Sequence, residues 1–247
     1  MLTKTATIIH EARPKPLSSL PMSEGRTALV FGATGLIGSY VVEQLCADDR
    51  YSTVRVFSRR EVPLPDSKAE LVLTDFSQLG AVADNIKGHD LFMCLGTTLR
   101  TAGSKEKQRY IDQQLPLEVA AIASRNGVGA YLFVSSLGAK ASGGNFYLQL
   151  KGETEEALHQ YTFVKRVLLR PSMLLGPRKE RRIGEMIGKV LVVLLTPFLL
   201  GKLKRWRGIH ARTVAEAMIA IANSSDIKSV YESEEIAAVA KAARVTS

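Results

Sequence analysis

One strand-like run followed by three evenly spaced glycines constrains this chain more than any other feature. Residues 27–31 are apolar, and the segment Gly32-Ala-Thr-Gly35-Leu-Ile-Gly38 follows before a helical pattern begins. In such a strand–turn–helix unit the first glycine allows a tight turn, the second lets a ligand approach the backbone, and the third lets the helix pack closely. The free amide groups at the helix start attract phosphate. We therefore predict a pyrophosphate-binding turn, with contacts from Gly32, Thr34, Gly35, Leu36 and Ile37.

Short apolar runs alternate with helical patterns along most of the chain. Several of the runs are almost entirely apolar, which is typical of strands buried on both faces of a parallel sheet. The alternation predicts an α/β fold, a Rossmann-like doubly wound parallel sheet. The expected strands are 27–31, 53–58, 70–73, 91–95, 131–135 and 165–169, and the expected helices are 37–47, 76–85, 109–126 and 144–159.

The two ends of the chain depart from this pattern. Residues 1–25 contain three prolines and lack an amphipathic period, so we expect a disordered extension, with a cleaved targeting peptide as the alternative. Residues 26–223 are expected to form a single domain that includes a small substrate-covering part from about residue 172. Within that part, 184–195 and 213–223 have helical patterns. Residues 224–247 are expected to be a tail or a helix over 232–244.

Composition excludes several classes of protein. Hydrophobic residues make up 46% of the chain and charged residues 23%, which argues against a disordered or coiled-coil protein. Two cysteines are too few for a disulfide framework or a cysteine-rich zinc site, and the four histidines are scattered, so no metal is expected. No apolar run reaches the roughly 18 to 20 residues of a membrane-spanning helix. These features predict a cytoplasmic protein.

Two arginines follow the second expected strand. In a binder of NAD, a carboxylate near this strand end usually holds the ribose 2′-hydroxyl. Here Ser58 is followed by Arg59 and Arg60, and guanidinium groups bind a 2′-phosphate. We therefore expect NADP(H) rather than NAD, with contacts from these three residues. The alternative is a pair of solvated arginines on a loop.

Two further strand ends are expected to contact the cofactor. Asp75 follows the third strand and has two interpretations: a hydrogen bond to the adenine amino group, or a cap for a helix that starts at Phe76. The fourth strand ends in Cys94-Leu-Gly-Thr-Thr, at the sheet edge where ligands bind. Gly96 there lets a cofactor lie against the backbone. The contacts predicted from these two segments are Asp75, Phe76, Leu95, Gly96 and Thr97.

A tyrosine and a lysine lie four residues apart on the helix expected over 144–159. Tyr147 and Lys151 therefore share one helix face, where the ammonium group favours the phenolate and makes the tyrosine a usable proton donor or acceptor. Ser135 and Ser136 close the preceding strand, and a serine hydroxyl there can polarise a carbonyl group. Together with the glycine turn, this combination indicates a reductase site.

Four motifs, taken in order, resemble the atypical, extended branch of the short-chain dehydrogenase/reductase superfamily. Within that branch the chain is most similar to the Tat-interacting-protein oxidoreductase family and its bacterial NAD(P)-binding relatives, over about residues 26–223. The motifs are Gly32-Ala-Thr-Gly35-x-x-Gly38, Ser135-Ser136, Tyr147-x-x-x-Lys151 and Arg170-Pro171-x-x-x-x-Gly176-Pro177.

The resemblance implies roles for individual residues. It implies a Rossmann-like fold that binds NADPH, with Tyr147 as the acid/base and Lys151 as the residue that tunes it and holds the nicotinamide ribose. Ser136 is implied to position the substrate oxygen, and Ser135 takes this role if the register differs by one. The loop after Pro171 is implied to contact the nicotinamide end.

The net charge of +9 is concentrated in one region, because 13 Lys and Arg residues but only two Glu lie between Lys165 and Arg212. An apolar run at 190–200 is followed there by a basic one at 202–207. One interpretation is a roof over an apolar substrate pocket. The other is peripheral membrane contact through 189–207. Nucleic-acid binding is disfavoured, because aromatic residues are only 6% of the chain and no recognition motif is present.

Two functional hypotheses follow. The first is an NADPH-dependent oxidoreductase that reduces a small carbonyl substrate, with Tyr147, Ser136 and Lys151 as catalytic residues. The second is a regulatory protein that senses NADPH and changes its affinity for a protein partner or a membrane, with little or no turnover.

Overall fold

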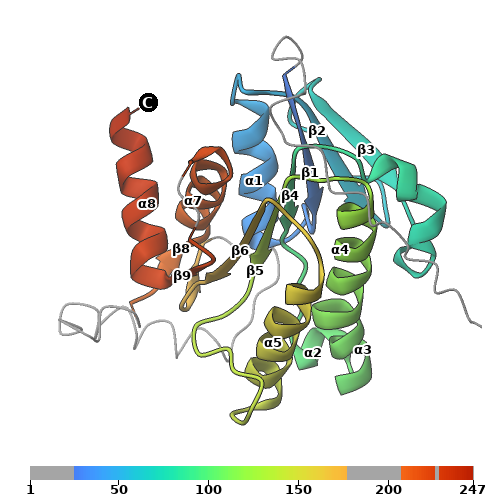
Figure 1. Ribbon diagram of the computed structural model, residues 1–247, viewed down its shortest axis with the longest axis vertical. Coiled ribbons are helices and arrows are strands. Elements are labelled where there is room, and N and C mark those ends of the chain that lie inside the picture. Colours follow the sequence, from blue (N-terminus) through green and yellow to red (C-terminus); the bar gives the residue numbers. More distant parts are fainter. Residues whose placement is uncertain (1–24, 177–206, 226–227, 247) are drawn as a thin grey trace, which may run out of the picture.

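A seven-stranded parallel sheet forms the centre of the protein, which a computed structural model describes for residues 25–176, 207–225 and 228–246. The strand order is β3-β2-β1-β4-β5-β6-β9 (Figure 1). This order runs in opposite directions from β1, so the crevice between the ends of β1 and β4 is the switch point where Rossmann-like sheets bind ligands. The strands are β1 (Arg26–Phe31), β2 (Tyr51–Ser58), β3 (Ala69–Leu73), β4 (Asp90–Met93), β5 (Ala130–Val134), β6 (Lys165–Arg170) and β9 (Val230–Glu232).

Helices cover both faces of the sheet (Figure 1). One face carries α1 (Leu36–Cys46), α7 (Ala211–Asn223) and α8 (Ser233–Thr246), so the last helices of the chain pack beside the first one. The other face carries α4 (Leu115–Arg125) and α5 (Phe146–Ala157). The remaining elements are η2 (Phe76–Asn85), α2 (Leu99–Ala102), α3 (Lys105–Arg109), η3 (Tyr110–Gln114), η4 (Leu158–Gln160), β7 (Leu174–Leu175) and β8 (Ile209–His210).

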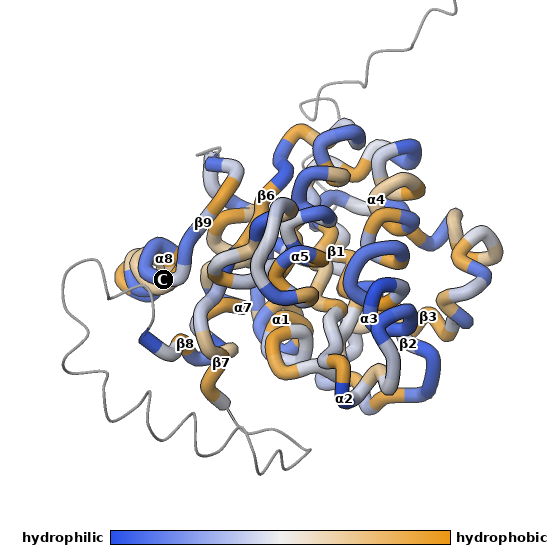
Figure 2. Tube along the Cα trace, turned by 90° about the horizontal axis from the view of Figure 1, so that it is seen from below, coloured by the Kyte–Doolittle hydropathy of each residue, from blue (hydrophilic) through white to orange (hydrophobic). Residues whose placement is uncertain are grey.

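The central strands are apolar because both of their faces are buried. Along β1, Ala28 and Val30 belong to the core under α1, α7 and α8, whereas Leu29 and Phe31 belong to the core under α4. All four side chains are fully buried. Figure 2 shows the hydrophobic colour on β1 at the centre and the hydrophilic colour on α3 at the rim. Alternate side chains of one strand thus supply two cores.

The predicted fold class is confirmed, and each of the six predicted strands is present within two residues of its expected bounds. Strands β7, β8 and β9 were not predicted, because runs of two or three residues show no period. The segment 76–85 is a kinked 3-10 segment, not a regular helix, and the helix expected over 109–126 is interrupted by η3. The end of the chain forms β9 and α8, which corresponds to the helical alternative for 232–244.

Three of the expectations fall on other parts of the chain. The disordered extension over 1–25 lies outside the described residues except for Gly25, and the helix over 184–195 and most of 189–207 lie outside them as well. No helix in the described part is long and apolar enough to cross a membrane.

Candidate functional site

The glycine turn joins β1 to α1 through very close backbone contacts. Gly32 has a φ of +87°, and a Cβ atom there would lie 2.6 Å from the carbonyl carbon of Cys94 at the end of β4. A Cβ on Gly38 would lie 2.2 Å from the carbonyl oxygen of Gly32. Both positions therefore require glycine. Gly35 precedes α1, and its N–H donates to the Gly32 carbonyl at 2.9 Å.

The start of α1 is open to a ligand. Thr34 and Gly35 are exposed, Leu36 is half-buried and Ile37 is buried. No side chain of the described residues caps the helix, and its first turn contains no acidic residue. The amide donors of this turn are therefore available to an anion, which is what a pyrophosphate-binding turn needs.

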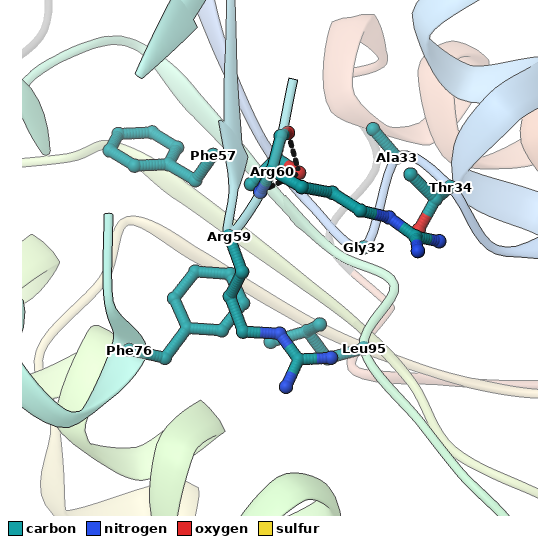
Figure 3. Close-up of a pocket in the computed structure, with 9 residues that line it drawn as sticks. Gly32, Ala33, Thr34, Phe57, Arg59, Arg60, Phe76 and Leu95 are labelled. Atoms are coloured by element: carbon teal, nitrogen blue, oxygen red, sulfur yellow. Dashed lines mark hydrogen bonds between the residues drawn. The ribbon is translucent and has the colours of Figure 1, made fainter. Parts of the chain in front are cut away.

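A cavity of about 390 Å³ lies next to the turn. Figure 3 shows its two arginines on different sides: the side chain of Arg60 extends toward Thr34, and that of Arg59 passes Phe76 toward Leu95. Sequence reasoning missed Ala33 and Phe57 in this wall. Seven of the predicted cofactor contacts are brought together here. The cavity is lined by Gly32, Ala33, Thr34, Phe57, Ser58, Arg59, Arg60, Phe76 and Leu95.

The arginine pair is fixed at the backbone and free at its charged ends. The hydroxyl of Ser58 donates to the carbonyl of Arg60 at 2.8 Å and accepts from its N–H at 3.3 Å, so the chain turns sharply after β2. Within the described residues, neither guanidinium of the pair forms an ion pair. Two guanidinium groups that form no ion pair with any described residue make the cavity beside the glycine turn electropositive, which favours a phosphate group.

Asp75 and Phe76 form the neighbouring wall. The carboxylate of Asp75 accepts a hydrogen bond of 3.0 Å from the N–H of Ser77, so it caps η2, as one of its two interpretations expected. That hydrogen bond lowers the pKa of Asp75, with a smaller contribution from Arg59. The hydroxyl of Tyr110 holds the backbone of Phe76 in place, because it donates a hydrogen bond of 2.9 Å to the Phe76 carbonyl.

Lys151 and Asp112 form a buried ion pair at the end of β4. The two side chains are 2% and 0% exposed, and Lys151 Nζ lies 3.0 Å from Asp112 Oδ1. The N–H of Thr97 donates to Asp112 Oδ2 at 2.9 Å. Gly96 is exposed above the pair, and a Cβ there would lie 3.3 Å from Asp112 Oδ1. Gly96, Thr97 and Lys151 are thus neighbours, but they do not line the cavity.

Tyr147 and Lys151 share one face of α5, as their spacing predicted. Lys151 Nζ lies 6.0 Å from the centre of the Tyr147 ring and donates to the carbonyl of Val134, the last residue of β5, at 3.2 Å. Tyr147 is half-buried. Lys151 therefore connects the tyrosine to the strand end that precedes the serine pair.

The two serines have different surroundings. Ser135 is buried, and its hydroxyl donates to Glu155 Oε1. Ser136 is half-buried, and its hydroxyl makes no hydrogen bond within the described residues. Of the two hydroxyls, only that of Ser136 is therefore without a hydrogen-bond partner among the described residues.

Glu155 anchors the strand ends behind the site, and sequence reasoning missed it. Arg170 Nε donates to Glu155 Oε1 at 3.0 Å, and Nη1 pairs with Glu232 of β9 at 3.2 Å. Pro171 is buried after Arg170, and its carbonyl accepts from the N–H of Leu137 at 3.0 Å. The loops after β5 and β6 are therefore tied together. The spacing of four residues between Lys151 and Glu155 was the available signal.

Asp112 is a further residue that sequence reasoning missed. It lies in a segment predicted to be an ordinary helix, where one acidic residue among many polar ones gives no signal of burial. Its position under Gly96 depends on η3, a π-helical turn that periodicity does not reveal.

Known proteins match both the sequence and the fold. A family model described as NAD(P)H-binding matches residues 32–189. Protein FMP52, mitochondrial, of Candida glabrata is 36% identical over 159 residues, which cover 64% of this chain and 68% of that protein. Protein HTATIP2 of Rattus norvegicus is 31% identical over 170 residues, 67% of this chain and 70% of that protein.

A solved structure supports the architecture. UDP-N-acetylglucosamine 4-epimerase from Methanobrevibacter ruminantium M1 superimposes with a TM-score of 0.64 over 84% of this chain and 76% of that one, at 16% identity. At this identity the likeness concerns the fold alone. The family resemblance derived from the motifs is confirmed by the sequence matches. The chain belongs to the NAD(P)H-binding family, has a Rossmann-like fold and is related to FMP52 and HTATIP2.

Proposed function

We propose that the protein is an NADPH-dependent reductase of a small carbonyl compound. The observation that carries the proposal is the contact of Lys151 with Tyr147 and with the strand end that precedes Ser136. Lys151 Nζ lies 6.0 Å from the centre of the Tyr147 ring and donates to the carbonyl of Val134, two residues before Ser136, at the carboxyl edge of the sheet. This edge is where open parallel sheets place their ligands.

The described residues fit a dinucleotide. The turn from Gly32 to Gly35 offers amide donors for the pyrophosphate, and the cavity beside Arg59 and Arg60 is large enough for a nucleoside group. Lys151 has donors for the hydroxyls of the nicotinamide ribose. A bound nicotinamide dinucleotide supplies the hydride.

The protein's own residues then handle the oxygen and the proton. The hydroxyl of Ser136 donates a hydrogen bond to the substrate carbonyl oxygen and orients it. The phenol of Tyr147 gives its proton to the same oxygen as negative charge develops there, and Lys151 stabilises the resulting phenolate. Ser135 serves only the Glu155 network.

Turnover with a panel of aldehydes and ketones tests the proposal. Oxidation of NADPH, followed by its absorbance, is expected to fall by about 100-fold or more in Tyr147→Phe, since general acid catalysis contributes this much. Tyr161→Phe, a tyrosine after η4 on another part of the surface, is the matched control and is expected to keep full activity. Tight NADPH binding without turnover on the whole panel contradicts the reductase and supports the regulatory alternative.

The preference for NADPH over NADH is part of the same proposal. The cavity at the end of β2 is lined by two cations, Arg59 and Arg60, and, among the described residues, by no carboxylate, which suits a 2′-phosphate better than a ribose 2′-hydroxyl. Calorimetry is expected to show NADPH binding more tightly, by about 10-fold or more per charge-assisted contact.

Single substitutions test which arginine contributes. Arg59→Ala and Arg60→Ala are expected to weaken NADPH binding and leave NADH binding nearly unchanged, while Arg125→Ala at the exposed end of α4 changes neither. Equal affinities of the wild type for the two nucleotides contradict the preference.

The location of the protein is a separate question. The cytoplasmic location expected from composition stays a prediction, and the FMP52 relatives are named mitochondrial. Imaging of the full chain with a C-terminal fluorescent tag in yeast decides between the two compartments.

A further inference from the structure

A buried carboxylate lies directly behind the residues proposed for the reaction. Asp112 is 0% exposed and belongs to η3, the π-helical turn between α3 and α4. π-helical turns are rare and occur often at functional sites. Thr97 donates a backbone hydrogen bond to Asp112 Oδ2, whereas Oδ1 faces Lys151 Nζ and receives no well-aligned hydrogen bond from any described group.

The burial of this pair is not explained by stability. Removing two charges from water costs several kcal/mol per ion, and a well-packed apolar pair often stabilises a fold equally well. The pair also lies at the ligand edge of the sheet, because Asp112 is bonded to Thr97 just beyond the end of β4. The arrangement therefore points to a role in the site.

The surroundings of Lys151 leave part of its ammonium group for a ligand. An ammonium has three N–H donors. One reaches Val134 O at 3.2 Å, and Asp112 Oδ1 lies 3.0 Å away. The ring of Phe133 lies 4.7 Å from Nζ and the ring of Tyr147 6.0 Å away. Within the described residues, at least one donor of the ammonium group therefore has no acceptor.

Gly96 keeps this group accessible. A Cβ at that position would lie 3.9 Å from Lys151 Nζ and 3.3 Å from Asp112 Oδ1. Gly96 is itself exposed, so a side chain there would cover the ion pair. The lack of one leaves the ammonium within reach of a molecule that lies against the backbone.

We propose that Asp112 is a positioning residue, which holds the ammonium of Lys151 beneath Gly96 with one donor left for the nicotinamide ribose. Its role toward the ribose rests on the proposed function, whereas its hold on Lys151 does not. The charge balance agrees with this geometry. Burial lowers the pKa of Lys151, but Asp112 first, then Tyr147 and Glu155, raise it above its ordinary value.

The first test needs no nucleotide. The pKa of Lys151, followed by NMR of isotope-labelled lysine, is expected to fall below that of an ordinary lysine in Asp112→Asn, because burial then outweighs the remaining partners. Asp90→Asn is the matched control: Asp90 is also fully buried and ion-paired, but with Arg26 at the opposite end of β4. A pKa of Lys151 that is unchanged in Asp112→Asn overturns the proposal.

The second test separates the two ends of the cofactor. Asp112→Asn is expected to lower the affinity for NADPH by about 10-fold, which is the effect of one charge-assisted hydrogen bond. The affinity for adenosine 2′,5′-bisphosphate is expected to stay unchanged, since that probe lacks the nicotinamide half. Lys151→Met is expected to have the same pattern. If Asp112 acts through Lys151, the double variant is no weaker than Lys151→Met alone. Additive losses overturn the proposal.

Further variants guard against misfolding and misreading. If Asp112→Asn does not fold, Gly96→Ala takes its place in the binding test. The added methyl group is expected to lower the affinity for NADPH and to leave the affinity for the bisphosphate unchanged. An NADPH affinity equal to that of the wild type in this variant overturns the proposal. If the wild type binds no nicotinamide dinucleotide, the proposed function fails, and the titration of Lys151 still decides whether Asp112 positions it.

Discussion

The contact between Gly38 and Gly32 offers the sharpest test of how the glycine turn is built. A methyl group at position 38 would lie 2.2 Å from the carbonyl oxygen of Gly32, 2.7 Å from its carbonyl carbon and 3.1 Å from the Cα of Ala33. All three are backbone atoms, so no side chain can rotate to make room. For Gly38→Ala the start of α1 must move by about 1 Å to restore normal contact distances.

Two opposing effects decide the size of the loss. Alanine favours the interior of a helix over glycine by about 1 kcal/mol. Overpacking against a rigid neighbour costs about 1–3 kcal/mol or more, and here the displaced helix also carries Val41 and Leu45, which are fully buried. The clash therefore outweighs the helix preference. We expect a net loss of about 1–2 kcal/mol in the free energy of unfolding, or about 2–8 °C in Tm for a chain of this size.

The assay combines thermal unfolding with calorimetry of NADPH binding. Because the moved helix start carries the amide donors, the affinity for NADPH is expected to fall by about 10-fold or more. Gly80→Ala is the matched control, since a Cβ at Gly80 meets nothing within 4 Å, and its effect on stability is expected to stay within about 0.5 kcal/mol. The reasoning is refuted if Gly38→Ala has the same Tm and the same affinity for NADPH as Gly80→Ala.

Three further predictions concern stability and are checked by urea denaturation. His89 Nδ1 accepts from a backbone N–H, and burial first, then Arg26, lowers its pKa. As the pH falls, His89 therefore takes up a proton in the unfolded chain before it does so in the folded chain, and the free energy of unfolding decreases below a pH of about 6.5. His89→Asn is expected to make the decrease between pH 7.5 and 5.5 smaller. Lys165→Met removes the ammonium that binds the carbonyls of Ile221 and Ala222 at the end of α7 and is expected to cost about 1–3 kcal/mol; no loss contradicts the capping role. Tyr51→Phe removes a hydrogen bond of 2.8 Å to the buried Asp90 and is expected to cost about 1–2 kcal/mol, whereas wild-type stability shows that the carboxylate finds enough partners without it.

The parts of the fold that could be predicted are those whose cause lies within a few neighbouring residues. Strand β1 is apolar on both faces because two helical layers cover it, and this is visible as an unbroken apolar run. The glycine turn is visible because Gly32 and Gly38 have close backbone contacts that exclude every other residue. Strand β9 was missed because three residues beside β6 depend on pairing with Leu168, Leu169 and Arg170, which lie about 60 positions away.

The candidate site divides in the same way. The spacing of Tyr147 and Lys151 places them on one helix face wherever that helix packs, so sequence alone was sufficient. The partners of buried groups are set by packing between elements. Ser135 and Ser136 are adjacent and chemically identical, and only the approach of Glu155 from α5 distinguishes the engaged hydroxyl from the free one.

Asp112 shows why the remaining part of the site could not be predicted from the sequence. A regular helix through this region would satisfy every polar side chain by exposing it, and nothing in the local sequence requires otherwise. The π-helical turn changes which side chains face inward, and Asp112 then meets a lysine 39 positions later in the chain together with a backbone N–H of the loop after β4. Each of these contacts stabilises the others: without Lys151 the carboxylate would be a buried unpaired charge, and without Asp112 the ammonium would be one. Because Asp112, Lys151 and the N–H of Thr97 stabilise one another only when all three are in place, none of the three segments shows the arrangement in its own sequence.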